Sequence, residues 1–239
     1  GGSAGAGGSA GAGGSAGAGG SAGAGGSGSG TAEYEQDFEA LVPTDANALS
    51  GDGWLYFGAV FDGTVDPPAF KFDFGPFAAP TVSGQISGIA TGEGGPDQGD
   101  NQLSVFSNYE CCDPAIGSTE PQGHRNGTDL VDTIVFQQRP IVADDIGKIF
   151  TFTFDAKKGN IELDTTAQAF IKTIVGSDTT NNIVLDTTAL PTDPAWATYT
   201  VTIDLSNVPV GAILQFGFST RAKDFQGAGN FYDNIVFTK

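Results

Sequence analysis

The feature that most constrains the fold of this chain is an alternation of apolar and polar residues with a period of two. It is clearest in KIFTFTFDAK at 148–157 and in ATYTVTIDL at 197–205, where large apolar side chains occupy every second position. Successive side chains of a β-strand point to opposite faces, so such segments are expected to be half-buried strands.

The same signal extends over most of the chain. Further segments rich in β-branched and aromatic residues lie between turn residues at 34–42, 53–61, 69–74, 82–90, 102–109, 130–138, 167–175, 213–221 and 230–238. Strands that follow one another without helical crossovers predict an all-β, two-sheet antiparallel sandwich. The predicted core includes Phe150, Phe152, Phe154, Ile213, Phe216 and Phe218, the last three with a local irregularity at Leu214.

The composition divides the chain into two parts. Residues 1–30 consist of four GGSAGA repeats followed by GGSGSG, with no charge and no large side chain. Such a segment buries no useful apolar area, so we expect a flexible Gly/Ser/Ala-rich linker, either natural or an introduced spacer. Residues 31–239 carry the net charge of −18 and are expected to form one domain.

This charge excludes some classes of partner. The chain has 28 Asp and Glu residues against 10 Lys and Arg, too few cations to neutralise a row of phosphates. We therefore expect neither nucleic acid nor a membrane as partner, and no apolar run approaches the roughly 18 residues of a membrane-spanning helix. An Asp-, Thr-, Asn- and Gly-rich composition with few lysines is common in secreted proteins, so we expect an extracellular location.

Several motifs resemble a known superfamily. QDFEALVPTDANALSGDGW at 36–54, FTFTFDAKKGNIE at 150–162 and NFYDNIVF at 230–237 are similar to carbohydrate-binding modules of the galactose-binding-like superfamily, of the type found in families four, nine, sixteen and twenty-two. The resemblance implies a jelly-roll β-sandwich that binds a polysaccharide or oligosaccharide without catalysis. It also implies a structural Ca²⁺ ion, and a catalytic module attached through the N-terminal linker is a possible partner.

The resemblance also indicates where the calcium would lie. Carried onto this sequence, the Phe-Glu pair of the first strand and the acidic residue of the last strand are Glu39 and Asp233. Asp37 and Asp100 are further candidate ligands, because Ca²⁺ prefers carboxylate and carbonyl oxygens. The alternative is that these carboxylates are solvated ends of strands in an acidic protein.

The candidate sugar-binding residues surround one long segment, SNYECCDPAIGSTEPQGHRNGTD at 107–129, whose turn residues predict a surface loop. Its Tyr109 could stack on a sugar, while polar side chains nearby could reach sugar hydroxyl groups. Two aromatic residues elsewhere, Trp54 and Phe225, lie outside the core alternation. Trp54 is either a platform for a sugar ring or a core residue. The full candidate set is Trp54, Tyr109, His124, Arg125, Gln138 and Phe225. A solvated loop of chance composition is the alternative.

The same loop contains both cysteines of the chain, Cys111 and Cys112. Adjacent Cα atoms are closer than in an ordinary disulfide, so a bond between them would be strained. In an oxidising compartment it is nevertheless the plausible intramolecular product. Free thiols, an intermolecular bridge or a metal site with His124 are the alternatives.

We expect no enzymatic activity, because the sequence shows no pair of carboxylates patterned for acid and base chemistry. Two other functions stay open. One is an extracellular structural or adhesive subunit that forms fibres. The other is a jelly-roll polysaccharide lyase or hydrolase, for which the candidate residues are Tyr109, His124, Arg125 and Arg139.

Overall fold

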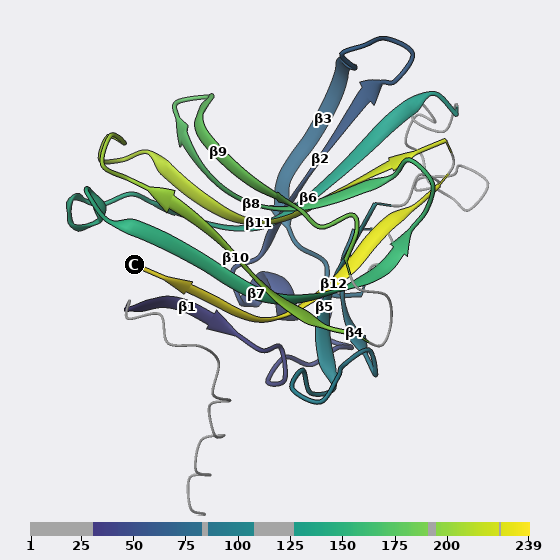
Figure 1. Cartoon of the computed structure of the whole chain (residues 1–239), viewed down its shortest axis with the longest axis horizontal. Helices are drawn as coiled ribbons and strands as arrows, with labels where there is room; N and C mark the ends of the chain where they lie inside the picture. Colours follow the sequence, from purple (N-terminus) through teal and green to yellow (C-terminus); the bar gives the residue numbers. More distant parts are fainter. Residues whose placement is uncertain (1–30, 83–85, 108–126, 191–194, 225) are drawn as a thin grey trace, which may run out of the picture.

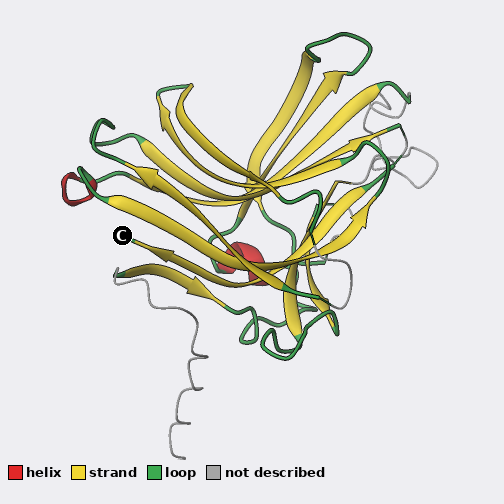
Figure 2. Cartoon of the chain, in the orientation of Figure 1, coloured by secondary structure: helices red, strands yellow, loops and turns green. Residues whose placement is uncertain are grey.

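The computed structural model describes residues 31–82, 86–107, 127–190, 195–224 and 226–239. These contain twelve strands, the four-residue helix α1 (Ala48–Gly51) and the 3-10 helix η2 (Ala143–Asp145) (Figures 1 and 2). No helix among them is long and apolar enough to cross a membrane. The strands are β1 (Ala32–Gln36), β2 (Leu55–Asp62), β3 (Ala69–Ala78), β4 (Ser87–Thr91), β5 (Asn101–Ser107), β6 (Asp129–Pro140), β7 (Ile149–Ile161), β8 (Thr166–Val175), β9 (Asp178–Asp186), β10 (Ala197–Asp204), β11 (Ile213–Lys223) and β12 (Ala228–Thr238).

The strands form two antiparallel sheets that pack face to face as a jelly-roll β-sandwich, which confirms the predicted fold class (Figure 1). The first sheet has the order β10-β7-β12-β5-β4, and β1 also pairs with β12. The second sheet has the order β3-β2-β6-β11-β8-β9. Below, these are called sheet A and sheet B.

The last strand joins the two ends of the chain within sheet A. The first half of β12, from Ala228 to Tyr232, pairs with β5, and its second half, from Ile235 to Thr238, pairs with β1. The first and last strands are therefore neighbours, and the two β12 residues between these halves, Asp233 and Asn234, lie at the point where its partner changes.

Aromatic side chains from both sheets fill the core. Phe152 and Phe154 on β7 contact Phe218 on β11, with ring centroids 5.3 Å and 5.0 Å apart. Trp54 lies beside the same ring, at 6.5 Å. Phe150 is also buried, so the inward set predicted for β7 is confirmed.

Three details of the strand prediction are wrong. On β11 the core position belongs to Leu214 and not to Ile213, because the strand keeps a regular register and alternation places Leu214 with Phe216 and Phe218. β9 was missed, since it is a polar edge strand whose residues are nearly all exposed. β1 ends at Gln36, because Phe38 adopts a positive φ of 59° that ends the strand.

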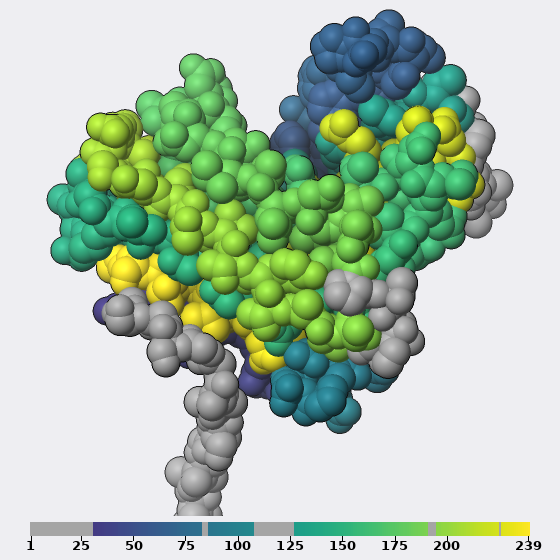
Figure 3. All heavy atoms as spheres, viewed as in Figure 1, coloured from purple at the N-terminus to yellow at the C-terminus, as the bar shows by residue number. Residues whose placement is uncertain are grey.

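Sheet B curves so that its outer face, which points away from sheet A, is concave. The β8–β9 hairpin and the β2–β3 hairpin rise at opposite edges of this sheet (Figure 1). Figure 3 shows the molecular surface hollowed between the two hairpins. We call this surface the concave face.

A buried carboxylate ties the chain end to the η2 turn. Asp145 is fully buried and accepts hydrogen bonds from Arg139 (2.6 Å), from the Val142 N–H (2.9 Å) and from Lys239 near the end of β12 (3.2 Å). The Arg139 hydrogen bond, despite opposing desolvation, holds the pKa of Asp145 well below its usual range.

Asp145→Asn is expected to destabilise the domain by about 2–3 kcal/mol at pH 7, because hydrogen bonds to a charged group are lost. A lowered folded-state pKa contributes stability above the unfolded pKa of about 3.9 and loses it as the pH falls toward the folded value. The difference between parent and variant should therefore shrink below about pH 4. Urea unfolding at several pH values measures it. Asp144→Asn, at the exposed neighbour, is the control, and an equal loss there would contradict the role of Asp145.

Candidate functional site

An apolar row crosses the concave face from one edge of sheet B to the other. The register aligns side chains on five adjacent strands, β2, β6, β11, β8 and β9. Because neighbouring strands are about 4.8 Å apart, the row spans about 19 Å. Its members are Leu55, Phe136, Gly217, Phe170 and Val184.

The apolar row forms a floor rather than a set of exposed platforms. Phe136 and Phe170 are each only 3% exposed, yet neither belongs to the core cluster between the sheets. Gly217 separates them, and β11 approaches β6 so closely there that an added Cβ would lie 2.2 Å from the Val135 carbonyl oxygen. The centre of the floor therefore has no side chain, because the close backbone packing at Gly217 leaves no room for one.

A polar row lies on one side of this floor. Gln138, Gln215, Lys172 and Asn182 are aligned across β6, β11, β8 and β9. The Gln215 Nε2 donates to the Gln138 Oε1 at 2.8 Å, which fixes the orientation of both amides. The Lys172 ammonium lies 4.8 Å from the centroid of the Phe170 ring, and burial lowers the pKa of Lys172.

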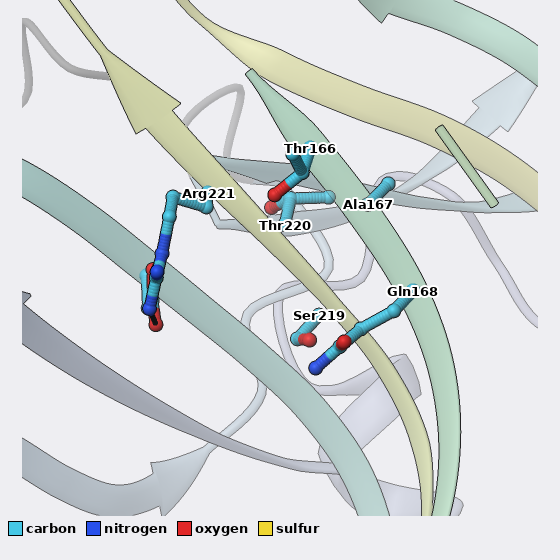
Figure 4. A pocket seen from close by; sticks show the side chains of 7 residues that line it. Thr166, Ala167, Gln168, Ser219, Thr220 and Arg221 are labelled. Carbon is cyan, nitrogen blue, oxygen red and sulfur yellow. Dashed lines mark hydrogen bonds and ion pairs between the residues drawn. The ribbon is translucent and has the colours of Figure 1, made fainter. Parts of the chain in front are cut away.

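A second polar group lies on the other side and surrounds a hollow of about 140 Å³. This volume is similar to that of a cavity of about 150 Å³ that holds benzene, so it accommodates one small ring or a ring substituent. Figure 4 shows the Gln168 side chain reaching toward Ser219, with Arg221 further along β11. Arg221 forms a bidentate ion pair with Asp132, and both of its nitrogen–oxygen distances are 2.6 Å.

One exposed ring stands at the edge of the same face. Phe70 on β3 is 58% exposed and lies edge-on to Phe61 on β2, with centroids 5.9 Å apart. The guanidinium of Arg221 lies over Phe61 at 5.1 Å. This edge therefore combines an exposed aromatic ring with polar side chains.

A separate acidic group surrounds Asp233 where β12 changes partner. Asp233 is fully buried, its Oδ1 accepts from the Asn234 N–H at 2.7 Å, and its Oδ2 is buried without a hydrogen-bond partner among the described residues. Burial, with the negative charges of Glu39, Asp155 and Asp37, raises the pKa of Asp233 to about 8. A buried carboxylate oxygen beside three acids is a place that a cation would stabilise.

The residues of this group have different roles from those expected. Asp155, which was not predicted, lies opposite Asp233 on β7 and accepts from Gln98 at 2.9 Å and from Asn234 at 2.8 Å. Asp100, also a predicted ligand, has an exposed side chain and is not among the charges that raise the pKa of Asp233, so it is left out of this group.

The predicted ligand Glu39 is already engaged by the backbone, since it accepts from the N–H of Asn101 at 2.7 Å. In the described ranges no three His, Cys, Asp or Glu side chains are arranged so that they could hold a metal ion by themselves. A cation here would thus need backbone carbonyls, side-chain amides or water as further ligands, which Ca²⁺ accepts.

The structure tests only part of the predicted sugar-binding set. Trp54 is fully buried in the core, and its Nε1 donates to Tyr34 at 2.9 Å, so its interpretation as a sugar platform is wrong. Gln138 lies exposed on the concave face. The other predictions fall outside the described residues and stay predictions: Tyr109, His124, Arg125 and Phe225 for sugar binding, and Cys111 and Cys112 for the disulfide.

Sequence reasoning missed most of the concave face. The polar side chains Gln168 and Lys172 lie at every second position around Phe170, and this alternation was visible in AQAFIKTIV. Nothing in the alternation shows that the outer face is hollow, however, and Phe136 and Phe170 look like ordinary core residues in the sequence.

No family model and no curated protein matches the sequence. Among solved structures, the chain is similar to the family 11 carbohydrate-binding module of a cellulosomal cellulase of Clostridium thermocellum, with 12% identity, 87% of this chain and 96% of that chain covered, and a TM-score of 0.39. It is similar to a Stig cyclase from Fischerella sp. TAU, with 14% identity, coverage of 87% and 96%, and a TM-score of 0.45. It also matches the enzymatically active domain of tailspike protein 4 of bacteriophage CBA120, with 11% identity, coverage of 66% and only 18%, and a TM-score of 0.39. These low scores carry no argument about what this chain binds.

Proposed function

We propose that this domain is a non-catalytic carbohydrate-binding module that holds a polysaccharide chain on the concave face of sheet B. The observation that carries the proposal is the apolar floor from Leu55 to Val184, which runs across five strands with polar side chains along both sides.

This arrangement suits the chemistry of a sugar chain. A pyranose ring presents an apolar face made of C–H groups and a rim of hydroxyl groups, so it is recognised by an apolar surface with a few fixed polar groups. The ends of the floor, half-buried Leu55 and exposed Val184, reach the surface and supply the first. The oriented amide pair of Gln138 and Gln215 supplies the second, since each amide both donates and accepts hydrogen bonds. The exposed ring of Phe70 would stack on a sugar at the edge of the face.

We further propose that Asp233 and Glu39 bind a structural calcium ion, with Asp155 and Asp37 as additional acidic groups. The support is the buried, unpartnered Oδ2 of Asp233 together with the like charges around it. The ion would neutralise these charges and tie β12 to the segment that follows β1. Its proposed role is structural, because the concave face belongs to the other sheet.

Carbohydrate binding is tested by calorimetric titration of the full chain with a panel of neutral plant, bacterial and algal polysaccharides. The variant Gln138→Ala/Gln215→Ala is expected to weaken binding of the best ligand about tenfold, because it removes the hydrogen bonds of both amides. Thr202→Ala, on an exposed position of sheet A, is the matched control and should bind like the parent. Equal binding by the double variant would place the site elsewhere. The proposed function is contradicted if neither this panel nor a panel of acidic polysaccharides contains a binder.

A further inference from the structure

Lys172 differs from almost every other cationic side chain in the described part of the chain. Each described Lys and Arg forms an ion pair, apart from Lys158 and Lys172. This is unexpected in a protein with 28 acidic residues and 10 basic ones. Lys158 lies on β7 in sheet A, so Lys172 is the one unpaired cation described on the concave face.

The ammonium of Lys172 lies where a charge without an ion-pair partner is energetically unfavourable. Its ammonium is partly buried over Phe170, where the loss of water disfavours the charged form and lowers the pKa of Lys172. Its cross-strand neighbours, Gln215 and Asn182, carry neutral amides. None of these groups compensates a positive charge as a carboxylate would.

The carboxylates of the same face are placed elsewhere. Asp132 is engaged by Arg221 in another row. Asp186 lies opposite Gln168, four residues along β8 from Lys172, and accepts from the N–H of Thr188 at 2.8 Å. Four residues of strand correspond to about 13 Å, more than the Debye length of about 10 Å at 0.1 M salt. Since no carboxylate among the described residues lies beside Lys172, this place is open to an anion that comes with the ligand.

We infer that the concave face selects a polysaccharide with isolated carboxylate groups, that is, a mainly neutral chain bearing occasional uronic acid units, and that Lys172 binds the carboxylate. This inference rests on the proposed carbohydrate binding and names its substrate class. Isolated carboxylates fit better than a densely charged polymer for two reasons. In the part of the chain that the structure describes, the face offers one unpaired cation among neutral amides, and the net charge of −18 repels a polyanion.

The test compares acidic polysaccharides of low charge density, glucuronoxylan and xanthan among them, with the same polymers after chemical reduction of their carboxyl groups to alcohols. Reduction keeps the sugar backbone and removes only the charge. The parent protein is expected to bind at least one native acidic polymer about tenfold more tightly than its reduced form, as for a charge-assisted hydrogen bond. The difference should shrink at high salt, because a partly exposed ion pair is screened.

Variants assign the effect to one residue. Lys172→Met is expected to abolish the preference for the native polymer, and Lys172→Arg to keep it. Lys158→Met, which removes the other unpaired lysine, should also keep it. Unchanged thermal unfolding shows that each variant is folded.

Equal binding of native and reduced polymers, or a preference that survives in Lys172→Met, overturns the inference. The proposed function still stands in that case if neutral polysaccharides bind and the Gln138→Ala/Gln215→Ala variant loses them. If no polysaccharide of either panel binds, the proposed function fails and the inference falls with it.

Discussion

Asp233→Asn is expected to change the stability of the domain in opposite directions with and without calcium. In a chelator at pH 7 the variant should be more stable than the parent, because folding of the parent forces the Asp233 carboxyl, whose pKa is raised to about 8, to take up a proton or to keep an unfavourable charge. In calcium it should be less stable, because the parent gains about 2.7 kcal/mol when the ion is present at a hundredfold excess over its dissociation constant. Thermal unfolding of both proteins in chelator and in millimolar calcium measures the reversal.

Asp100→Asn is the matched control for this experiment, since the Asp100 carboxylate is exposed and is not among the charges that raise the pKa of Asp233. It should leave the calcium response unchanged. A parent protein whose unfolding is the same in chelator and in calcium would rule out the ion, and the acidic group would then be a source of instability at this corner of the sandwich.

Trp54→Ala is expected to destabilise the domain by about 3–5 kcal/mol, because it removes a large buried side chain and leaves a cavity. The ring contacts Phe38, Phe218 and Tyr34 in the core, and its Nε1 also donates to the Tyr34 hydroxyl. Trp54→Phe should cost less, since it keeps part of the ring and loses the hydrogen bond. Chemical denaturation with tryptophan-independent detection, such as far-UV circular dichroism, measures both.

Phe70→Ala gives the contrasting result that separates a core ring from a surface ring. Phe70 is 58% exposed, so its removal should change the stability of the domain little. It should weaken the binding of any sugar that stacks on the ring at that edge of the concave face. A Trp54→Ala protein that is as stable as the parent would contradict the assignment of Trp54 to the core.

The strands whose alternate side chains point into the core were predictable from the sequence, because this alternation is a local property of the chain. Phe150, Phe152 and Phe154 reach the core because a strand turns every second side chain to the same face. β9 has no such signal, because it lies at the edge of sheet B and only Leu185 on it packs against the core. Its pairing with β8 comes from backbone hydrogen bonds, which leave little trace in the pattern of side chains.

The candidate sites depend on contacts between residues far apart in the chain. Asp233 and Asp155 are 78 positions apart in the numbering and meet because β12 and β7 pair in one register. The motifs of the resemblance pointed to Glu39 and Asp233. The position of Asp155 beside Asp233 follows only from how the strands align.

By itself, the sequence determined that this protein is a β-sandwich: alternation, turn residues and the lack of helical segments depend on neighbours in the chain and need no knowledge of the fold. Only the tertiary structure decided which aromatic residues face outward and which polar residues share a surface. Trp54 and Phe170 are both large rings in predicted strands, yet one lies between the sheets and the other on the concave face. Curvature and register belong to the sheet as a whole, so they place Lys172 beside Gln215 and Asn182 without any mark in the local sequence.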